Sequence, residues 1–307
     1  MQDPRLMSEE DFEKSYLSAV ELVDGPHPER AVQMIEDLIV RGCEELAIDD
    51  ETVINLRMYL GRAMWRSGVS ARAIPILESA LADAKKSLGW QHRVTFSCAG
   101  NLCRALGDVG RLDEAIRIAK AIYEKRVRVF GELDNGTLNS LGHLSQLMFE
   151  SGEVSYAVDL MSSLYDKRCQ AFGKNDDRAR CSWYNLTVMK AQLDNDEQSL
   201  LDLLAQYTAE YGSDHPDTIG LWAHLGGLLE RTGKLSEALE VWREVEERRH
   251  KVFGEVAIPT LNAVDRRLCL QSSLGDDGLL DQIDVVRRTK ALIRGQANLG
   301  TVNFEEF

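Results

Sequence analysis

Two histidines and several carboxylates lie close together in the stretch EYGSDHPDTIGLWAHLGGLLERTGKLSEALEVW, Glu210 to Trp242. An imidazole beside a carboxylate, as in His215 and Asp217, is a pair of groups that general acid–base catalysis uses. The alternative interpretation is structural, because His-Pro ends one helix and Asp-Thr begins the next. We favour the structural interpretation, since the segment lies at a linker between two repeated units.

The common catalytic motifs do not occur in this sequence. There is no GxxxxGK[ST] phosphate-binding loop, no HExxH zinc motif and no GxSxG nucleophile turn. The stretches LGDDGLL and HLGGLLE contain glycines but lack the strand-to-helix setting of a phosphate site. Six cysteines without a CxxC pair predict buried, reduced thiols. We therefore expect no enzymatic activity, no metal ion and no cofactor.

The composition is that of a globular protein of 307 residues, with 44% hydrophobic and 28% charged residues. A formal net charge of −14 argues against nucleic-acid or anionic-membrane binding, because both require a basic surface. No apolar run approaches the roughly 18 residues of a membrane span. The acidic start MQDPRLMSEEDFEKSY does not resemble a signal peptide. We expect a cytoplasmic protein whose residues 1–7 are a disordered or non-native start.

Two series of turn residues recur along the chain in one register. An aromatic or aliphatic residue precedes glycine at spacings of 42, 42, 39 and 42 residues, at Gly89, Gly131, Gly173, Gly212 and Gly254. One unit has therefore lost about one helical turn. A second series marks turns at Gly68, Gly110, Gly152 and Gly233, with Asp194 in the place of glycine in the shortened unit. A small residue follows these turns at Ala31, Ala73, Ala115, Ala157, Ser199 and Ala238.

The segments between these turns predict pairs of α-helices. Apolar side chains recur at helical spacing before and after each turn glycine. A single helical hairpin cannot bury both of its apolar faces, so neighbouring pairs must stack, and the predicted fold is an all-α solenoid. We expect about six repeats, at residues 8–49, 50–91, 92–133, 134–175, 176–214 and 215–256. They form a single solenoid domain over residues 8–300, with a capping unit at 257–300 and a tail at 301–307.

The repeat resembles the tetratricopeptide repeat in its kinesin light chain-like form with a 42-residue period. The resemblance rests on the turn glycines, the small residue of the second helix and a Leu-Gly-like pair in the first. These pairs are Leu60-Gly61, Leu102-Cys103, Leu144-Ser145, Leu186-Thr187 and Leu225-Gly226. The linker of this form, aromatic-Gly-x-x-His-Pro-x-Thr, is matched by YGSDHPDT. The resemblance covers nearly the whole chain and implies a right-handed superhelix that binds a protein or peptide in its concave groove.

In this family the first helix of each pair lines the groove. Side chains five and one residues before the paired Leu, and two and six residues after it, form one stripe. The candidate groove residues are Asn55, Tyr59, Arg62, Arg66, Asn101, Arg104, Asn139, His143, Gln146, Asn185, His224 and Arg231. We expect the amides of Asn101 and Asn185 to pair with the backbone of an extended peptide. The alternative is that these amides and the histidines bridge neighbouring helices of the scaffold.

Three arginines fall on this stripe in consecutive units of an acidic chain. Arg62, Arg66 and Arg104 each offer a guanidinium, the group best shaped to hold a carboxylate through two parallel hydrogen bonds. We therefore expect the N-terminal half of the groove to accept an acidic segment or a free C-terminus. The alternative is that these arginines pair with neighbouring carboxylates, including Asp108.

The positions of most tryptophans indicate that their rings pack inside the protein and do not bind a partner. Trp65, Trp183, Trp222 and Trp242 fall at differing positions within helices, whereas Trp90 lies in a linker, where its ring can meet a partner.

The predicted fold leaves two classes of function open. The protein is expected to be a non-catalytic adaptor for a peptide or protein segment, or a ligand-sensing regulatory module of a signalling or NTPase/transcription-regulator system. A terminal repeat with an exposed apolar face would also allow homo-oligomers.

Overall fold

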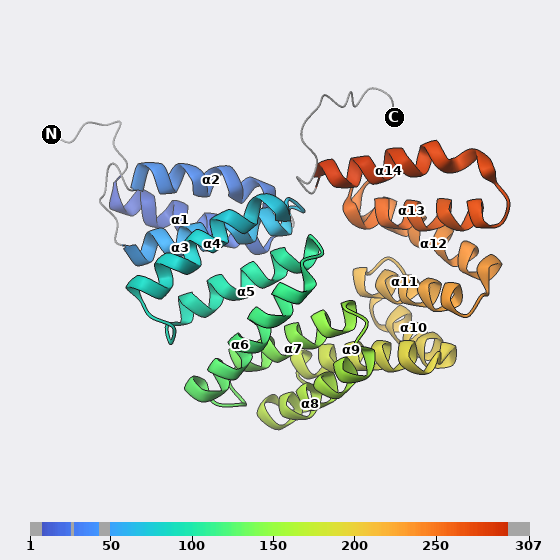
Figure 1. The fold of residues 1–307 in the computed structure, drawn as a ribbon, viewed down its shortest axis with the longest axis horizontal. Coiled ribbons are helices and arrows are strands. Elements are labelled where there is room, and N and C mark those ends of the chain that lie inside the picture. Colours follow the sequence, from blue (N-terminus) through green and yellow to red (C-terminus); the bar gives the residue numbers. More distant parts are fainter. Residues whose placement is uncertain (1–7, 26–27, 43–49, 294–307) are drawn as a thin grey trace. The chain divides into compact units, whose positions relative to one another are not determined.

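The computed structural model describes residues 8–25, 28–42 and 50–293. Within these ranges the chain forms α-helices, one short 3-10 helix and no strand (Figure 1). None of the described helices combines the length and the apolar composition that crossing a bilayer requires. The predicted start at residues 1–7 and the tail at 301–307 lie outside the described residues.

The contacts between residues divide the chain into two compact units, the first of which ends at Ser151. Its helices are α1 (Glu9–Asp24), α2 (Pro28–Arg41), α3 (Asp50–Arg66), α4 (Ser70–Ser87), α5 (Arg93–Asp108), α6 (Leu112–Phe130) and α7 (Asn135–Glu150). Each helix packs against the next one along the chain. The first helices of successive pairs also pack against each other, α1 on α3 and α3 on α5, so they share one face of the unit.

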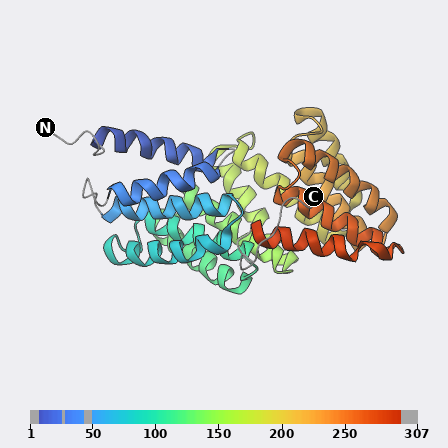
Figure 2. The ribbon, with the colours of Figure 1, turned by 90° about the horizontal axis from the view of Figure 1, so that it is seen from above.

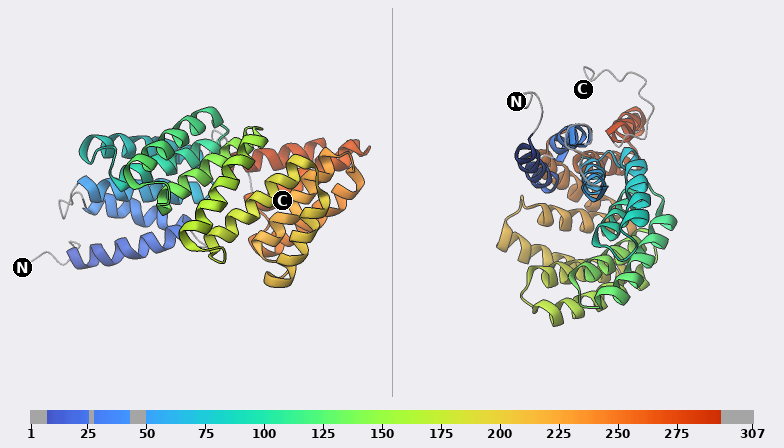
Figure 3. Two further views of the ribbon diagram at one scale, coloured as in Figure 1. Left: turned by 90° about the horizontal axis from the view of Figure 1, so that it is seen from below. Right: turned by 90° about the vertical axis from the view of Figure 1, so that its left-hand side faces the viewer.

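The second unit is built in the same way (Figures 2 and 3). Its helices are α8 (Val154–Phe172), α9 (Asp177–Asp194), α10 (Glu197–Tyr211), α11 (Pro216–Arg231), α12 (Leu235–Phe253), α13 (Ile258–Ser273), the 3-10 helix Asp277–Leu279 and α14 (Leu280–Ile293). The predicted all-α repeat solenoid is confirmed by these stacked helices. The handedness of the superhelix, the repeat boundaries and the single domain stay predictions.

The turn glycines end helices with a positive φ angle. The φ angles of Gly131 and Gly173 are 85° and 92°, values that a residue with a β-carbon adopts only at a cost. The shortened unit differs from the prediction, because α9 continues through Asp194 and the left-handed residue is Asn195, with φ 54°. Asparagine adopts this left-handed conformation more readily than most other residues that carry a β-carbon. The turn therefore lies one residue later than the sequence predicts.

The linkers between helix pairs supply N-caps. The Nδ1 atom of His215 accepts a hydrogen bond from the backbone N–H of Asp217 at 3.3 Å, and Pro216 occupies the first turn of α11. Asp134 and Asp176 accept backbone N–H groups in the same way at the starts of α7 and α9. The imidazole of His215 therefore acts as a helix cap, which supports the structural interpretation of the His215–Asp217 pair.

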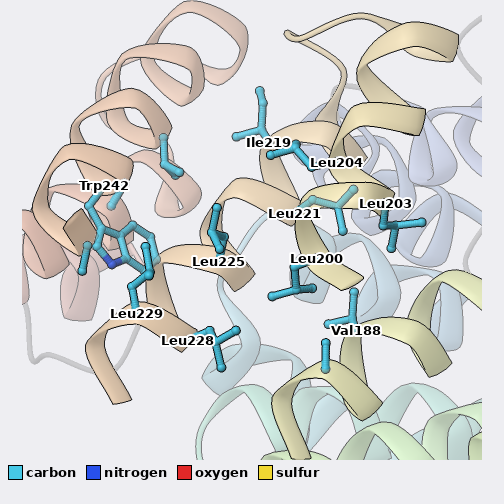
Figure 4. Close-up of a cluster of buried hydrophobic side chains, with 14 of the residues drawn as sticks. Val188, Leu200, Leu203, Leu204, Ile219, Leu221, Leu225, Leu228, Leu229 and Trp242 are labelled. Atoms are coloured by element: carbon cyan, nitrogen blue, oxygen red, sulfur yellow. The ribbon is translucent and has the colours of Figure 1, made fainter. Parts of the chain in front are cut away.

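Small residues let the two helices of a pair approach closely. Ala73, Ala115 and Ala238 have no exposed surface. In the second unit, Gly226 of α11 faces Trp242 of α12, and a β-carbon added to this glycine would lie 2.9 Å from the indole ring. Figure 4 shows the Trp242 ring beside leucines of α11, within a buried cluster that extends to α9 and α10. The close approach thus fixes how the two helices bury their apolar faces.

Two neighbouring glycines of α11 test this close approach. Gly226→Ala should lower the free energy of unfolding by about 1–3 kcal/mol, because the added methyl group must displace the Trp242 ring. Gly227→Ala is the matched control, since its β-carbon would meet nothing within 4 Å. Its higher helix propensity should raise the free energy of unfolding by up to about 1 kcal/mol. Urea unfolding followed by circular dichroism measures both, and equal effects would contradict the proposed contact.

Candidate functional site

The first helices of the pairs in the first unit are joined by a polar network around Arg104 of α5. The Nε atom of Arg104 donates a hydrogen bond to Nε2 of His143 on α7 at 2.8 Å. Its Nη1 atom donates to Oδ1 of Asn101 at 3.0 Å, and Nδ2 of Asn101 lies 3.0 Å from the sulfur of Met58 on α3. The network therefore connects the first helices of three consecutive pairs. It requires a neutral His143, because the Nε2 atom that accepts a hydrogen bond carries no proton.

Arg104 carries a positive charge that no ion pair among the described residues neutralises. Its guanidinium carbon lies 5.4 Å from the centroid of the Trp65 ring, a cation–π arrangement. Burial, followed by the nearby charge of Arg62, lowers the pKa of Arg104 to about 10. Arg104 thus stays positively charged at neutral pH. Among residues 8–25, 28–42 and 50–293, no carboxylate forms an ion pair with it.

A cavity of about 220 Å³ opens beside this network. Its lining residues are Trp65, Cys103, Arg104, Gly107, Asp108, His143, Gln146, Leu147 and Glu150. Asp108 and Glu150 lie at the C-terminal ends of α5 and α7, about one helical turn beyond Arg104 and Gln146 respectively. The cavity therefore has a cation near one end and two carboxylates near the other. The described residues bring no three His, Cys, Asp or Glu side chains together as metal ligands.

The other two arginines of the stripe have partners within the protein. The Nη2 atom of Arg62 lies 2.6 Å from Oδ1 of Asp24, at the end of α1. Arg66 donates to the backbone carbonyls of Asp24 and Gly25 at 3.3 and 3.4 Å. Both arginines therefore connect α3 to the C-terminal end of α1. The internal ion pair of Arg62 involves Asp24, whereas Asp108 accepts a hydrogen bond from Ser70 at 2.9 Å.

The remaining groove candidates of the first unit lie around this centre. Gln146 lines the cavity and donates to Glu150 at 3.0 Å. The ring of Tyr59 packs edge-on against Tyr16, with the centroids 6.2 Å apart. Asn55 is half-buried on α3, and Asn139 is exposed on α7. Neither of these two asparagines is among the residues that line the cavity.

In the second unit, predicted groove residues bridge helices of the scaffold. Arg231 of α11 donates to the side-chain oxygen of Gln192 on α9 at 2.6 Å and to its backbone carbonyl at 2.9 Å. The amide nitrogen of Gln192 lies 3.4 Å from the backbone carbonyl of His224. Asn185 contacts the sulfur of Cys181, one turn earlier on α9, at 3.8 Å. The contacts of Gln192 with Arg231 and His224 connect α9 with α11, whereas the contact of Asn185 lies within α9.

His224 is half-buried on α11 and does not offer a positive charge to a ligand. Burial, followed by the charge of Arg249, lowers the pKa of His224 to about 4. Its imidazole is therefore neutral at physiological pH. The cationic candidate that faces a cavity is Arg104 in the first unit, and His224 contributes only neutral hydrogen-bonding groups.

Trp65 lines the candidate site around Arg104, although its position in the sequence does not indicate this. The sequence predicts packing for this tryptophan, but the half-buried ring lines the Arg104 cavity. Trp65 follows Arg62 by three residues, so the two side chains lie on adjacent parts of the α3 surface. The Leu-based stripe does not include this position. A search for aromatic residues next to the stripe arginines would have found it.

No family model and no curated protein sequence matches the chain. Solved structures share its fold. The TPR-like repeats of a kinesin light chain from Podosopora anserina are 19% identical, with a TM-score of 0.50, over 66% of this chain and 98% of that chain. A Rap protein complexed with Competence and Sporulation Factor is 12% identical, with a TM-score of 0.55, over 89% of this chain and 77% of that one.

A third similar structure is the STAND signal-transduction ATPase with a tetratricopeptide repeat sensor from Pyrococcus horikoshii. It is 14% identical, with a TM-score of 0.57, over 94% of this chain and 42% of that chain. At these identities the likeness shows the fold alone. The chain has the tetratricopeptide-repeat fold, and the predicted resemblance to repeats of the kinesin light chain-like type is confirmed at that level.

The lowered pKa of His224 predicts a pH dependence of stability. An unfolded histidine titrates near 6.5 and His224 in the folded protein near 4, so between these values the unfolded state binds more protons. The titration of His224 therefore does not change the free energy of unfolding above about pH 7. It lowers this free energy as the pH decreases from about 6.5 towards 4. Relative to His224→Gln, the wild type should lose roughly 2 kcal/mol of unfolding free energy between about pH 7 and about pH 4.5.

Urea unfolding of the two proteins across this pH range measures the difference directly. Carboxylates titrate in both proteins, and their contribution cancels in the comparison. A difference in unfolding free energy that stays constant with pH would contradict the lowered pKa.

Proposed function

We propose that this protein is a non-catalytic interaction module that binds a segment of another protein in the groove of its first unit. The observation that carries the proposal is Arg104, a charged guanidinium without a carboxylate partner in the described chain, at the wall of a 220 Å³ cavity. The fold agrees with such a role. Rap proteins with this fold, at 12% and 14% identity, are solved with Competence and Sporulation Factor and with the Phr* peptide.

A carboxylate is the group that Arg104 is best placed to bind. Its Nε atom and one Nη1 hydrogen are used by His143 and Asn101, so the Nη2 hydrogens and the second Nη1 hydrogen are left for a ligand. These donors form the end of the guanidinium that binds a carboxylate through two parallel bonds. His143 and Asn101 hold the guanidinium in one orientation, which lowers the entropy cost of binding.

The cavity favours a single carboxylate over a run of acidic residues. Asp108 and Glu150 line the same cavity and would repel a second negative charge. Arg62, the arginine expected to share an acidic ligand, is paired with Asp24 at 2.6 Å. A free C-terminus therefore fits the cavity better than an acidic segment does. A basic side chain near that terminus would meet the two carboxylates.

A ligand-sensing regulatory module is the alternative function. The Arg104 network connects α3, α5 and α7, so a ligand that competes for its hydrogen bonds would change how these helices pack. Such a module and an adaptor would use the same site. Homo-oligomers through a terminal repeat stay a prediction.

Removal of the Arg104 charge tests the proposed carboxylate site. A peptide library with free C-termini, and the same library as C-terminal amides, should differ in binding to the full chain. Arg104→Gln should lower the affinity for the free-acid peptides about tenfold or more, because a charge-assisted hydrogen bond is lost. Arg66→Gln is the matched control, since Arg66 contacts backbone carbonyls outside the cavity. Equal binding of acids and amides would contradict the proposal.

The two cavity carboxylates predict a preference within the peptides. Peptides with Lys or Arg in the last two positions should bind about threefold to tenfold more tightly than peptides with Glu there. The reason is that Asp108 and Glu150 attract a basic side chain and repel a carboxylate. The double variant Asp108→Asn/Glu150→Gln should lose this preference. Fluorescence anisotropy at low and high salt measures it, and an unchanged preference would show that these carboxylates do not face the ligand.

A further inference from the structure

A second hollow lies between α4 and α6 and shares no lining residue with the Arg104 cavity. Its volume is about 430 Å³, within the range of small-ligand and side-chain pockets. Apolar side chains of α4, α5 and α6 line it, namely Leu81, Leu102, Ile118 and Ile122. Lys85, Arg117 and Trp90 line it as well. The hollow therefore combines an apolar lining with basic and aromatic groups.

Trp90 is exposed in this hollow, as its position in the linker between α4 and α5 predicts. The side chain is 39% exposed. The ammonium nitrogens of Lys85 and Lys125 lie 4.4 and 4.9 Å from the centroid of its ring. One indole therefore has two cations close to it, which brings two like charges near each other at the surface.

Neither Lys85 nor Lys125 forms an ion pair with any carboxylate in the described ranges. Acidic residues outnumber basic ones in this chain, 50 to 36, so a group of cations on its surface is a local exception. Of the two glutamates that line the hollow, Glu114 pairs with Arg111 at 2.6 Å, which leaves Glu78 with two lining cations, Lys85 and Arg117. With Lys125 beside the Trp90 ring included, the region carries more cations than unpaired carboxylates.

We propose that this hollow is a second protein-docking surface, which takes an acidic segment of a partner that carries an apolar side chain. We call it the Trp90 surface, defined by Trp90, Lys85, Lys125 and Arg117. The apolar side chain of the partner enters between Leu81 and the α6 isoleucines, where it leaves water. Carboxylates on either side of it pair with the lysines. The cation–π contacts hold both ammonium groups in place before the partner binds.

The two proposed sites differ in the ligand that each one accepts. The Arg104 cavity has one cation and two carboxylates in its lining and favours one terminal carboxylate, whereas the three cations of the Trp90 surface favour several carboxylates. A peptide whose two ends are blocked offers no terminal carboxylate. Such a peptide probes the Trp90 surface without engaging Arg104, so the failure of one proposal is distinguishable from the failure of the other.

The experiment measures binding of a fluorescent, N-acetylated and C-terminally amidated peptide in which glutamates flank a Leu-Phe pair. The full chain should bind this probe and should not bind the same peptide with lysines in place of the glutamates. The double variant Lys85→Glu/Lys125→Glu should lower the affinity for the acidic probe about tenfold or more. Higher salt should weaken the binding, because the contacts lie at the surface.

A matched double variant changes the same charges outside the hollow. Lys86→Glu/Lys120→Glu reverses two exposed lysines on α4 and α6 that neither line the hollow nor lie over the Trp90 ring, and it should change the affinity less than about twofold. Thermal unfolding of both double variants by circular dichroism shows whether each is folded.

Trp90→Leu keeps an apolar side chain but removes the ring that holds the lysines, and it should weaken binding as well. The proposal is overturned if the wild type does not bind the acidic probe, if the lysine peptide binds as tightly, or if both double variants behave alike. Self-association that Lys85→Glu/Lys125→Glu abolishes, measured by sedimentation, would also overturn it, because a second copy of this chain would then be the occupant.

Discussion

The close approach of the two helices within each pair is the constraint on which the remaining structure depends. It is possible because the facing positions carry residues such as Ala115, Ala238 and Gly226, which leave room for large side chains of the opposite helix. A short distance within a pair exposes flat apolar surfaces to the next pair, and stacking buries them. The first helices of successive pairs are thereby brought into contact, α1 with α3 and α3 with α5. The hydrogen bonds of Arg104 are a consequence of this stacking.

The local signals at the helix ends agree with this packing. Glycines with positive φ end helices, and residues such as His215 and Asp134 cap the helices that follow. Each signal specifies where the chain reverses, so the apolar stripes of successive helices meet in register. Local sequence and tertiary packing thus favour the same structure, as in most natural proteins that fold to one state. His215 shows how a residue suited to catalysis serves this purpose.

The fold was predictable from the sequence because the same physical requirements return about every 42 residues, and each copy supports the others. Positions on the stripe followed from the paired Leu, which placed Arg104 and His143 on neighbouring helices. The partners of those side chains did not follow. The ion pair between Arg62 and Asp24 depends on where α1 ends in space, and the role of Trp65 depends on a ring that lies beside the stripe. Spacing predicts the helix face on which a side chain lies, whereas its contacts depend on tertiary geometry.

The shortened repeat shows which changes in length such an array tolerates. Helix α10 runs from Glu197 to Tyr211, 15 residues, whereas α8 and α12 each have 19. The repeat period is shorter by three residues, which amounts to about 300° of helical rotation, close to one full turn. Leu200, Leu203 and Tyr207 therefore still face the core. Insertions and deletions of three or four residues keep the phase of a helix, and an array of this kind can diverge in length in steps of whole turns without a loss of its core.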